Sequence, residues 1–283
     1  MTMPKVTIGD LELSRLIVGH NPPCGNSHVS ENMSRDMREY FTAENVVKLL
    51  HNCEAQGIDT WLARGDYHHV LYWLELFRRE GGQMNWIAQT ASEMHDVFQN
   101  IKVIAAAGAK GIYHHGSRTD SFWLNGEIDK TQDYLKCMRD QGVLVGVCSH
   151  IPEVFEYIED NDWDVDFYMN CFYNLSQSGA RESVIVSEAE QGPEDHLFGS
   201  DHPKRMCGVI QQTEKPCIAF KILGASRLCA TQEQVRETFQ FTVDNIKPND
   251  AICVGFFPKY LDQVKLNVEH MLAVSETLEL VAA

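Results

Sequence analysis

Two histidines and a lysine mark the places where this sequence could do chemistry. His114 and His150 each end a segment typical of a buried β-strand, and Lys221 lies inside the apolar segment 217–223. Histidine titrates near neutral pH and serves as an acid, a base or a metal ligand. A buried lysine is costly unless it is paired or used, and desolvation makes its amine a candidate base or Schiff-base nucleophile. We therefore predict His114, His150 and Lys221 to be catalytic.

Other polar residues at strand ends predict a substrate pocket around them. Arg64 ends one strand and is predicted to be catalytic through its positive charge. His20 and Asn21 end another strand, where they could contact substrate. Trp123 could stack on a sugar ring, with simple packing as the alternative. The substrate is expected to be a small molecule, cationic or neutral.

A divalent metal is an alternative use of the histidines. His20, His114 and His150 would be its ligands, as in an all-histidine zinc site. Against this alternative, the strand ends that we expect to face inward lack the carboxylates that oxygen-preferring cations require.

The elements that must position these side chains alternate regularly. Short apolar segments rich in β-branched residues are each followed by a segment with helical spacing, eight times in all, which is typical of a parallel sheet. The predicted strands are 16–21, 60–64, 86–90, 111–114, 143–150, 165–171, 217–223 and 251–257.

A closed (β/α)8 TIM barrel is the predicted fold, formed as one domain by residues 1–283. An open doubly wound sheet is disfavoured because the first strand lacks the G-x-G-x-x-G turn. Residues 5–13 are predicted to form a hairpin that could plug the barrel floor. Long connections at 22–41 and 172–200, after strands 1 and 6, are predicted lids or binding loops, with decorative insertions as the alternative.

The alternation of side chains along strand 217–223 predicts which of them face the pocket. Ile218, Phe220 and Ile222 form an apolar set that we assign to the helices, which directs Lys221 inward. By the same reasoning His114 faces the pocket and His115 points away.

Composition limits the partners of the protein. The formal charge of −16 disfavours nucleic acid and anionic membrane surfaces. No segment has the roughly 20 apolar residues of a spanning helix, and no signal peptide is visible, so we expect a cytoplasmic protein. The nine cysteines lack C-x-x-C spacing and are expected to be reduced.

Several segments, in order along nearly the whole chain, resemble those of aldo/keto reductases. The segment 57–67 (GIDTWLARGDY) is similar to that family's second strand, 111–115 (GIYHH) to the strand with its active-site histidine, and 145–148 (VGVC) to its fifth strand. Segments 13–19, 170–174, 221–228 and 255–267 resemble its first strand, its sixth strand and its last two strands with the following helix.

The resemblance implies an oxidoreductase that uses NADP on a carbonyl or a sugar-like substrate. Tyr67 matches the family's catalytic tyrosine and His114 its histidine. Asn170, Lys259 and Asn267 would lie near the cofactor. The sequence departs from the family pattern at two positions: Leu62 occupies the place of the aspartate, and strand three ends without the lysine.

Three classes of function remain open from the sequence. The first is an NADP-dependent reductase with Tyr67 or His114 as the proton donor. The second is a nicotinamide-independent lyase, isomerase or hydrolase that uses His114, His150 and Lys221, or a histidine-bound metal. The third is a non-catalytic binding protein, which a cluster of buried titratable groups disfavours.

Overall fold

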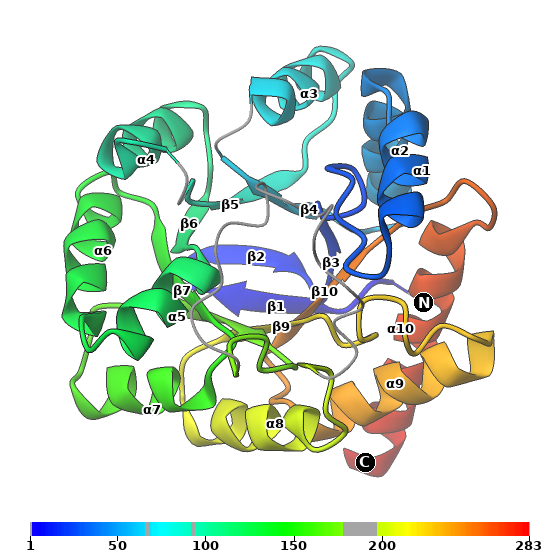
Figure 1. Ribbon diagram of the computed structural model, residues 1–283. Helices are drawn as coiled ribbons and strands as arrows, with labels where there is room; N and C mark the ends of the chain where they lie inside the picture. Colours follow the sequence, from blue (N-terminus) through cyan, green and yellow to red (C-terminus); the bar gives the residue numbers. More distant parts are fainter. Residues whose placement is uncertain (1, 66–67, 92–93, 178–196, 283) are drawn as a thin grey trace.

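Eight parallel strands close into a barrel, and helices surround it. The computed structural model describes residues 2–65, 68–91, 94–177 and 197–282, without the side chains of 277–282. The order around the barrel is β10-β3-β4-β5-β6-β7-β8-β9, so each strand pairs with its sequence neighbour and the last closes on the first (Figure 1). The predicted TIM-barrel fold is therefore confirmed.

The bounds of the elements agree closely with the hydrophobic pattern. The strands are β1 Lys5–Ile8, β2 Leu11–Ser14, β3 Leu16–Gly19, β4 Thr60–Arg64, β5 Asn85–Gln89, β6 Gly111–His114, β7 Leu144–Ser149, β8 Phe167–Cys171, β9 Cys217–Phe220 and β10 Ala251–Gly255. The helices are α1 Glu31–Tyr40, α2 Ala43–Ala55, α3 His68–Arg79, α4 Val97–Ala106, α5 Gly116–Leu124, η1 Ile128–Lys130, α6 Thr131–Arg139, α7 Pro152–Asp160, α8 His202–Gln212, α9 Gln232–Asn245 and α10 Gln263–Ala282.

Capping side chains and a proline begin several of the helices. Thr42 accepts a hydrogen bond from the Asn45 amide at the start of α2. Thr231 accepts one from the Gln234 amide at the start of α9, and Pro152 occupies the first turn of α7. These caps satisfy backbone donors that the first turn of a helix leaves without partners.

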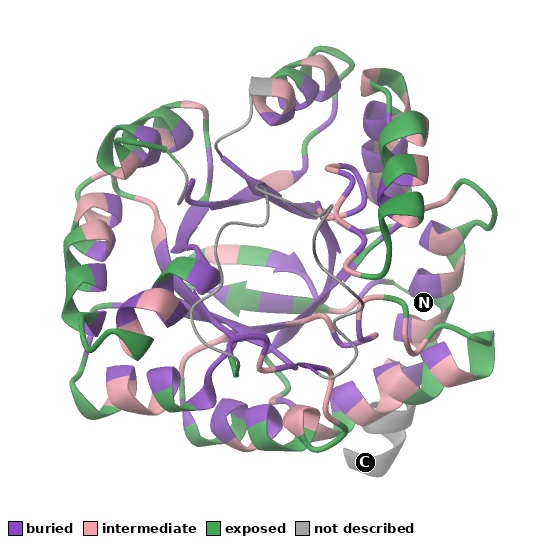
Figure 2. Cartoon of the chain, viewed as in Figure 1, coloured by how far each residue is buried: buried purple, intermediate pink, exposed green. Residues whose placement is uncertain are grey.

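The N-terminal hairpin closes the end of the barrel where the strands begin, as predicted. Strands β1 and β2 pair antiparallel around Gly9, whose φ of 56° favours glycine. Val6, Ile8 and Leu13 are buried in one cluster with side chains from inside the barrel. Figure 2 shows the hairpin, with buried and exposed residues along its strands, in the middle of the ring of barrel strands. In the part of the chain that the structure describes, the barrel is therefore open at the end where its strands terminate.

The first long connection contains more structure than the sequence indicated. Residues 31–40 form helix α1, which Ser30 caps by accepting a hydrogen bond from the Met33 amide. The segment 20–30 is therefore the true loop after β3. Of the second connection, 178–196 lies outside the described residues. No helix in the described ranges is long and apolar enough to span a membrane.

Candidate functional site

A cavity of about 890 Å³ occupies the end of the barrel where the strands terminate. Its floor is formed by inward side chains such as Leu62, Tyr113, Cys148 and Met169, and its walls by the loops that follow β3 and β9. The described ionisable side chains that line it are His20, His28, Asp36, Arg64, Tyr113, His115, Cys148, His150, Lys221, Cys229, Cys253 and Tyr260. The cavity is therefore rich in groups that can carry a positive charge.

His150 and Asp120 form the strongest polar pair of the cavity wall. His150 follows β7, and its Nδ1 atom lies 2.6 Å from Oδ2 of Asp120. Asp120, on α5, is fully buried and also accepts hydrogen bonds from Ser149 Oγ at 2.6 Å and Ser176 Oγ at 2.8 Å. A buried carboxylate needs such partners, because desolvation alone would neutralise it.

The charges of this pair follow from its contacts. Burial by itself lowers the pKa of His150, but interactions with Cys171 and Asp120 outweigh burial and raise the pKa to about 9. Burial raises the pKa of Asp120. The His150 charge and the hydrogen bonds have the opposite and larger effect, so the pKa of Asp120 lies below its ordinary value. The raised pKa of His150 and the lowered pKa of Asp120 both indicate that, at neutral pH, a protonated His150 is paired with an ionised Asp120.

Cys171 lies beside His150 because of strand register. Ser149 of β7 is paired with Asn170 of β8, so the next residues on the two strands, His150 and Cys171, are neighbours. The Cys171 side chain contacts His150 and contributes to its raised pKa.

Arg64 and His20 form a second group on the other side of the cavity. Arg64 ends β4 with only 2% of its surface exposed, and His20 follows β3. Burial, followed by the Arg64 guanidinium, lowers the pKa of His20 to about 3. His20 is therefore neutral beside a buried cation.

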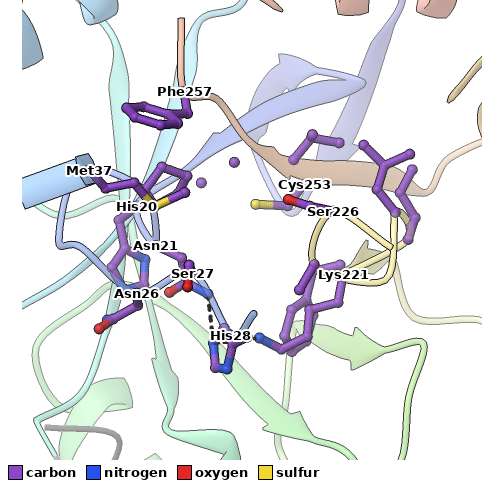
Figure 3. Close-up of a pocket in the computed structure, with 18 of the residues that line it drawn as sticks. His20, Asn21, Asn26, Ser27, His28, Met37, Lys221, Ser226, Cys253 and Phe257 are labelled. Carbon is purple, nitrogen blue, oxygen red and sulfur yellow. Dashed lines mark hydrogen bonds between the residues drawn. The ribbon is translucent and has the colours of Figure 1, made fainter. Parts of the chain in front are cut away.

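Lys221 reaches the cavity, although by a different route from the one the sequence predicted. Ile218 and Phe220 face the barrel interior, and Ala219 packs outward, so the expected alternation was reversed. The strand ends at Phe220, and Lys221 has a φ of 56°, which takes it out of the strand geometry. Its Nζ atom lies 3.0 Å from His28 Nε2 (Figure 3).

Asn21 completes a small polar group around His28. Its Nδ2 atom lies 3.4 Å from His28 Nε2, the same nitrogen that Lys221 approaches. The predicted positions of His20, Asn21, Arg64, His150 and Lys221 at one cavity therefore agree with the structure. Their functional roles stay predictions.

The structure corrects the prediction that His114 faces this cavity. The inward residue of β6 is Tyr113, and His114 packs outward against Phe122 and Tyr134, with its Nδ1 atom 2.8 Å from Thr119 Oγ1. His115, expected to point away, lines the cavity instead. A shift of one residue along a strand exchanges the two faces, which explains both errors.

Asn170 is misplaced in the prediction for the same reason. It points away from the barrel axis toward α8, and its Nδ2 atom lies 3.6 Å from Met206 Sδ. Trp123 lies on the outer side as well, against Tyr157, and does not line the cavity. The structure therefore supports the packing alternative for Trp123.

The three residues expected near a nicotinamide cofactor lie at different distances from the cavity. Asn170 is behind the strand, and Lys259 is at the rim, where it pairs with Asp36. Asn267 does line the cavity and donates from Nδ2 to Gln263 O at 2.6 Å. The structure therefore corrects the placement of Asn170, and the expected role of Lys259 and Asn267 stays a prediction.

The three histidines predicted to bind a metal do not meet either. His20 and His150 line the cavity, whereas His114 lies on the outer side of the barrel. Within the described ranges, no group of three or more histidine, cysteine or acidic side chains could hold a metal ion. Tyr67, the predicted catalytic tyrosine, lies outside the described residues.

Sequence reasoning missed Asp120 and His28. Asp120 lies on helix α5, not at a strand end, so strand patterns could not place a carboxylate beside His150. His28 belongs to the polar segment 20–28 (HNPPCGNSH), whose unusual composition was a signal for a site.

Comparisons with known proteins support the fold. No protein-family model and no curated protein matches the sequence. Among solved structures 389 chains match. One is the truncated form of 3-deoxy-D-arabino-heptulosonate 7-phosphate synthase from Thermotoga maritima, with 13% identity, coverage of 99% of this chain and 94% of that chain, and a TM-score of 0.57. This likeness supports a TIM barrel, the fold of many enzymes, but not the aldo/keto reductase family in particular.

Proposed function

We propose that this protein is an enzyme of the lyase or isomerase class that performs acid–base chemistry on a small anionic carbonyl or hydroxy compound without a nicotinamide. The observation that carries the proposal is the His150–Asp120 pair in the wall of a cavity that Arg64 also lines. Buried titratable groups with shifted pKa values, gathered in one cavity, are typical of catalytic sites.

His150 is suited to donate a proton. With a pKa of about 9 it is protonated at neutral pH, and its Nδ1 atom is engaged by Asp120. Proton transfer to a ligand therefore uses Nε2. Asp120 fixes the orientation of the ring and stabilises its charge, as a carboxylate does in other catalytic histidine pairs. Protonation of a carbonyl or leaving hydroxyl oxygen is the step that this pair would assist.

The charges around the cavity favour an anionic substrate, which revises the expectation of a cationic or neutral one. Arg64 is almost fully buried, and Lys221 and His150 add positive charge. Asp36 is the one carboxylate among the described lining residues, and it pairs with Lys259 and Tyr260 at the rim. The planar guanidinium of Arg64 matches the geometry of a carboxylate or phosphate group, which it could bind with two parallel hydrogen bonds.

The volume of the cavity is compatible with a metabolite. At about 890 Å³ it lies within the range of roughly 300–1,000 Å³ typical of small-molecule sites.

Titration calorimetry with inorganic phosphate and with acetate tests the anion preference. We expect saturable binding of at least one, and Arg64→Gln to weaken it by about tenfold or more, since a hydrogen bond to a charged group contributes about 1.5–3 kcal/mol. Arg79→Gln, an exposed i,i+4 partner of Glu75, is the matched control and should bind as the wild type does. Absence of binding to both anions, or equal binding by Arg64→Gln, would overturn the proposal.

A further inference from the structure

Unusual backbone conformations are concentrated around Lys221. Among the described residues, the non-glycine residues with positive φ are His28 (56°), Asp162 (50°), Lys221 (56°), Ala225 (50°) and Ser226 (77°). All except Asp162 line the cavity. Such conformations cost free energy and persist where the surrounding structure holds them, often at functional sites. The backbone therefore presents Lys221 and His28 to the cavity at an energetic cost.

The contact between these two residues determines which nitrogen of His28 is an acceptor. Lys221 Nζ lies 3.0 Å and Asn21 Nδ2 lies 3.4 Å from the same atom, His28 Nε2 (Figure 3). An ammonium and an amide nitrogen both donate hydrogen bonds. Nε2 must then accept, and the proton of the neutral ring lies on Nδ1. His28 thus holds a lone pair directed at the lysine amine.

Two loops hold this pair in place. Arg227 Nη1 donates to the His28 carbonyl at 3.2 Å and to the Gly224 carbonyl at 3.2 Å, which ties the loop after β3 to the loop after β9. Ser27, 5% exposed, hydrogen bonds to Ser34 Oγ at 2.9 Å and accepts from the Ser30 amide at 3.2 Å. The relative position of amine and imidazole is therefore set by several contacts that are buried or partly buried.

We propose that Lys221 is a nucleophile that forms a Schiff base with the carbonyl carbon of an anionic substrate, and that His28 accepts the proton of its ammonium. This inference rests on the proposed function and names its substrate class, a small aldehyde or ketone with a carboxylate or phosphate group. Arg64 would bind the anionic group, and the carbonyl would lie between Lys221 and the proton donor His150. All three line the same cavity.

The steps balance without any further reactant. Lys221 transfers a proton to His28 Nε2, and the neutral amine attacks the carbonyl carbon to form a C–N bond. The electron pair of the C=O bond moves to oxygen, which takes a proton from His150. The nitrogen, positively charged after the attack, gives one proton back to His150 and so regains its lone pair. The hydroxyl then receives the proton held by His28 and leaves as water, while the nitrogen lone pair forms the C=N bond. Overall, one ammonium and one carbonyl give one protonated imine and one water.

Trapping with sodium borohydride tests this proposal. Purified protein is incubated with pyruvate or with dihydroxyacetone phosphate, reduced, and analysed by intact mass and peptide mapping. We expect a stable secondary amine at Lys221 with at least one probe. Lys221→Arg should lose the adduct, and Lys136→Arg, an exposed lysine on α6 paired with Asp140, should keep it. His28→Gln should slow trapping by about tenfold or more, within the usual contribution of a positioned base.

The outcomes separate this inference from the proposed function. Phosphate or acetate binding by wild type and by a cooperatively melting Lys221→Arg, with no adduct from either probe, would overturn the Schiff base alone. If the wild-type protein bound neither phosphate nor acetate, the proposed function itself would be overturned. Trapping that persists in Lys221→Arg at the wild-type level would show reaction at other lysines and would also overturn the inference.

Discussion

At the scale of single residues, the site shows how environment divides three histidines of one cavity into different roles. Burial and the nearby Arg64 keep His20 neutral, whereas Asp120 and Cys171 keep His150 protonated despite equal burial. Nε2 of His28 is approached by both Lys221 Nζ and Asn21 Nδ2. The residue type alone predicts none of these differences, because each depends on a partner distant in sequence.

The pKa of His150 leads to a prediction for stability. Its folded pKa, about 9, exceeds its ordinary value of 6.5, so ionisation of His150 stabilises the fold fully below about pH 6.5. This contribution declines as pH rises and is lost above about pH 9. The difference in Tm between the wild type and His150→Gln should therefore shrink between pH 6 and pH 10, as measured by calorimetry. His51→Gln, on the outer helix α2, should show no such convergence. A constant difference for His150→Gln would contradict the assigned pKa.

Asp120→Asn tests the cause of the raised pKa directly. The amide keeps the shape of Asp120 but removes its negative charge. The effect of burial on His150 would then be opposed less strongly, and the pKa of His150 should fall. NMR titration of the His150 ring measures this change. Ser176→Ala, which removes a single hydrogen bond to Asp120, should lower it much less. Equal pKa values in wild type and Asp120→Asn would assign the shift to Cys171 instead.

At the scale of elements, the sequence predicted the strands well and the faces of their last residues poorly. All eight barrel strands overlap their predicted segments, because apolar runs and helix caps are local signals. The face of a residue also depends on the exact phase of the strand, and one residue of error exchanges inside for outside. His114 and Asn170 were misplaced for this reason, whereas Lys221 reached the cavity because its backbone leaves the strand. Asp120 could not be predicted, since its helix meets β7 only in three dimensions.

The hairpin offers a test of the barrel floor. Leu13 of β2 is fully buried in the cluster that fills the barrel interior. Leu13→Ala should lower the free energy of unfolding by about 2–5 kcal/mol, because it removes apolar contacts and leaves a cavity. Urea denaturation measures this loss. Glu12→Ala, exposed on the same strand, should change stability by less than about 0.5 kcal/mol. Anion binding should survive in folded Leu13→Ala, since the hairpin and the pocket lie at opposite ends of the strands. Equal stability of the two variants would show that the hairpin is not part of the core.

At the scale of the whole molecule, charge is distributed unevenly between surface and site. The chain carries a formal charge of −16, yet the described lining of its cavity has one carboxylate beside Arg64, Lys221 and His150. The expectation of a cationic or neutral ligand came from the net charge, whereas the lining of the cavity leads us to propose an anionic one. Affinity for a small molecule depends instead on the few groups it contacts inside the cavity, where interactions are less screened.

The same distinction between scaffold and site leads to a test that separates a reductase from an enzyme without nicotinamide. The resemblance to aldo/keto reductases follows segments of the barrel, whereas Asn170, which was expected near NADP, faces α8, and Lys259 pairs with Asp36. We therefore expect that NADPH neither quenches tryptophan fluorescence nor raises Tm. A ligand present at about 100 times its Kd would stabilise the fold by about 2.7 kcal/mol, which a thermal melt detects easily. Phosphate or acetate, whichever binds in calorimetry, is the positive control in the same melt. A stabilisation by NADPH that Lys259→Gln removes would restore the reductase, because it would show that Lys259 leaves Asp36 to bind the cofactor.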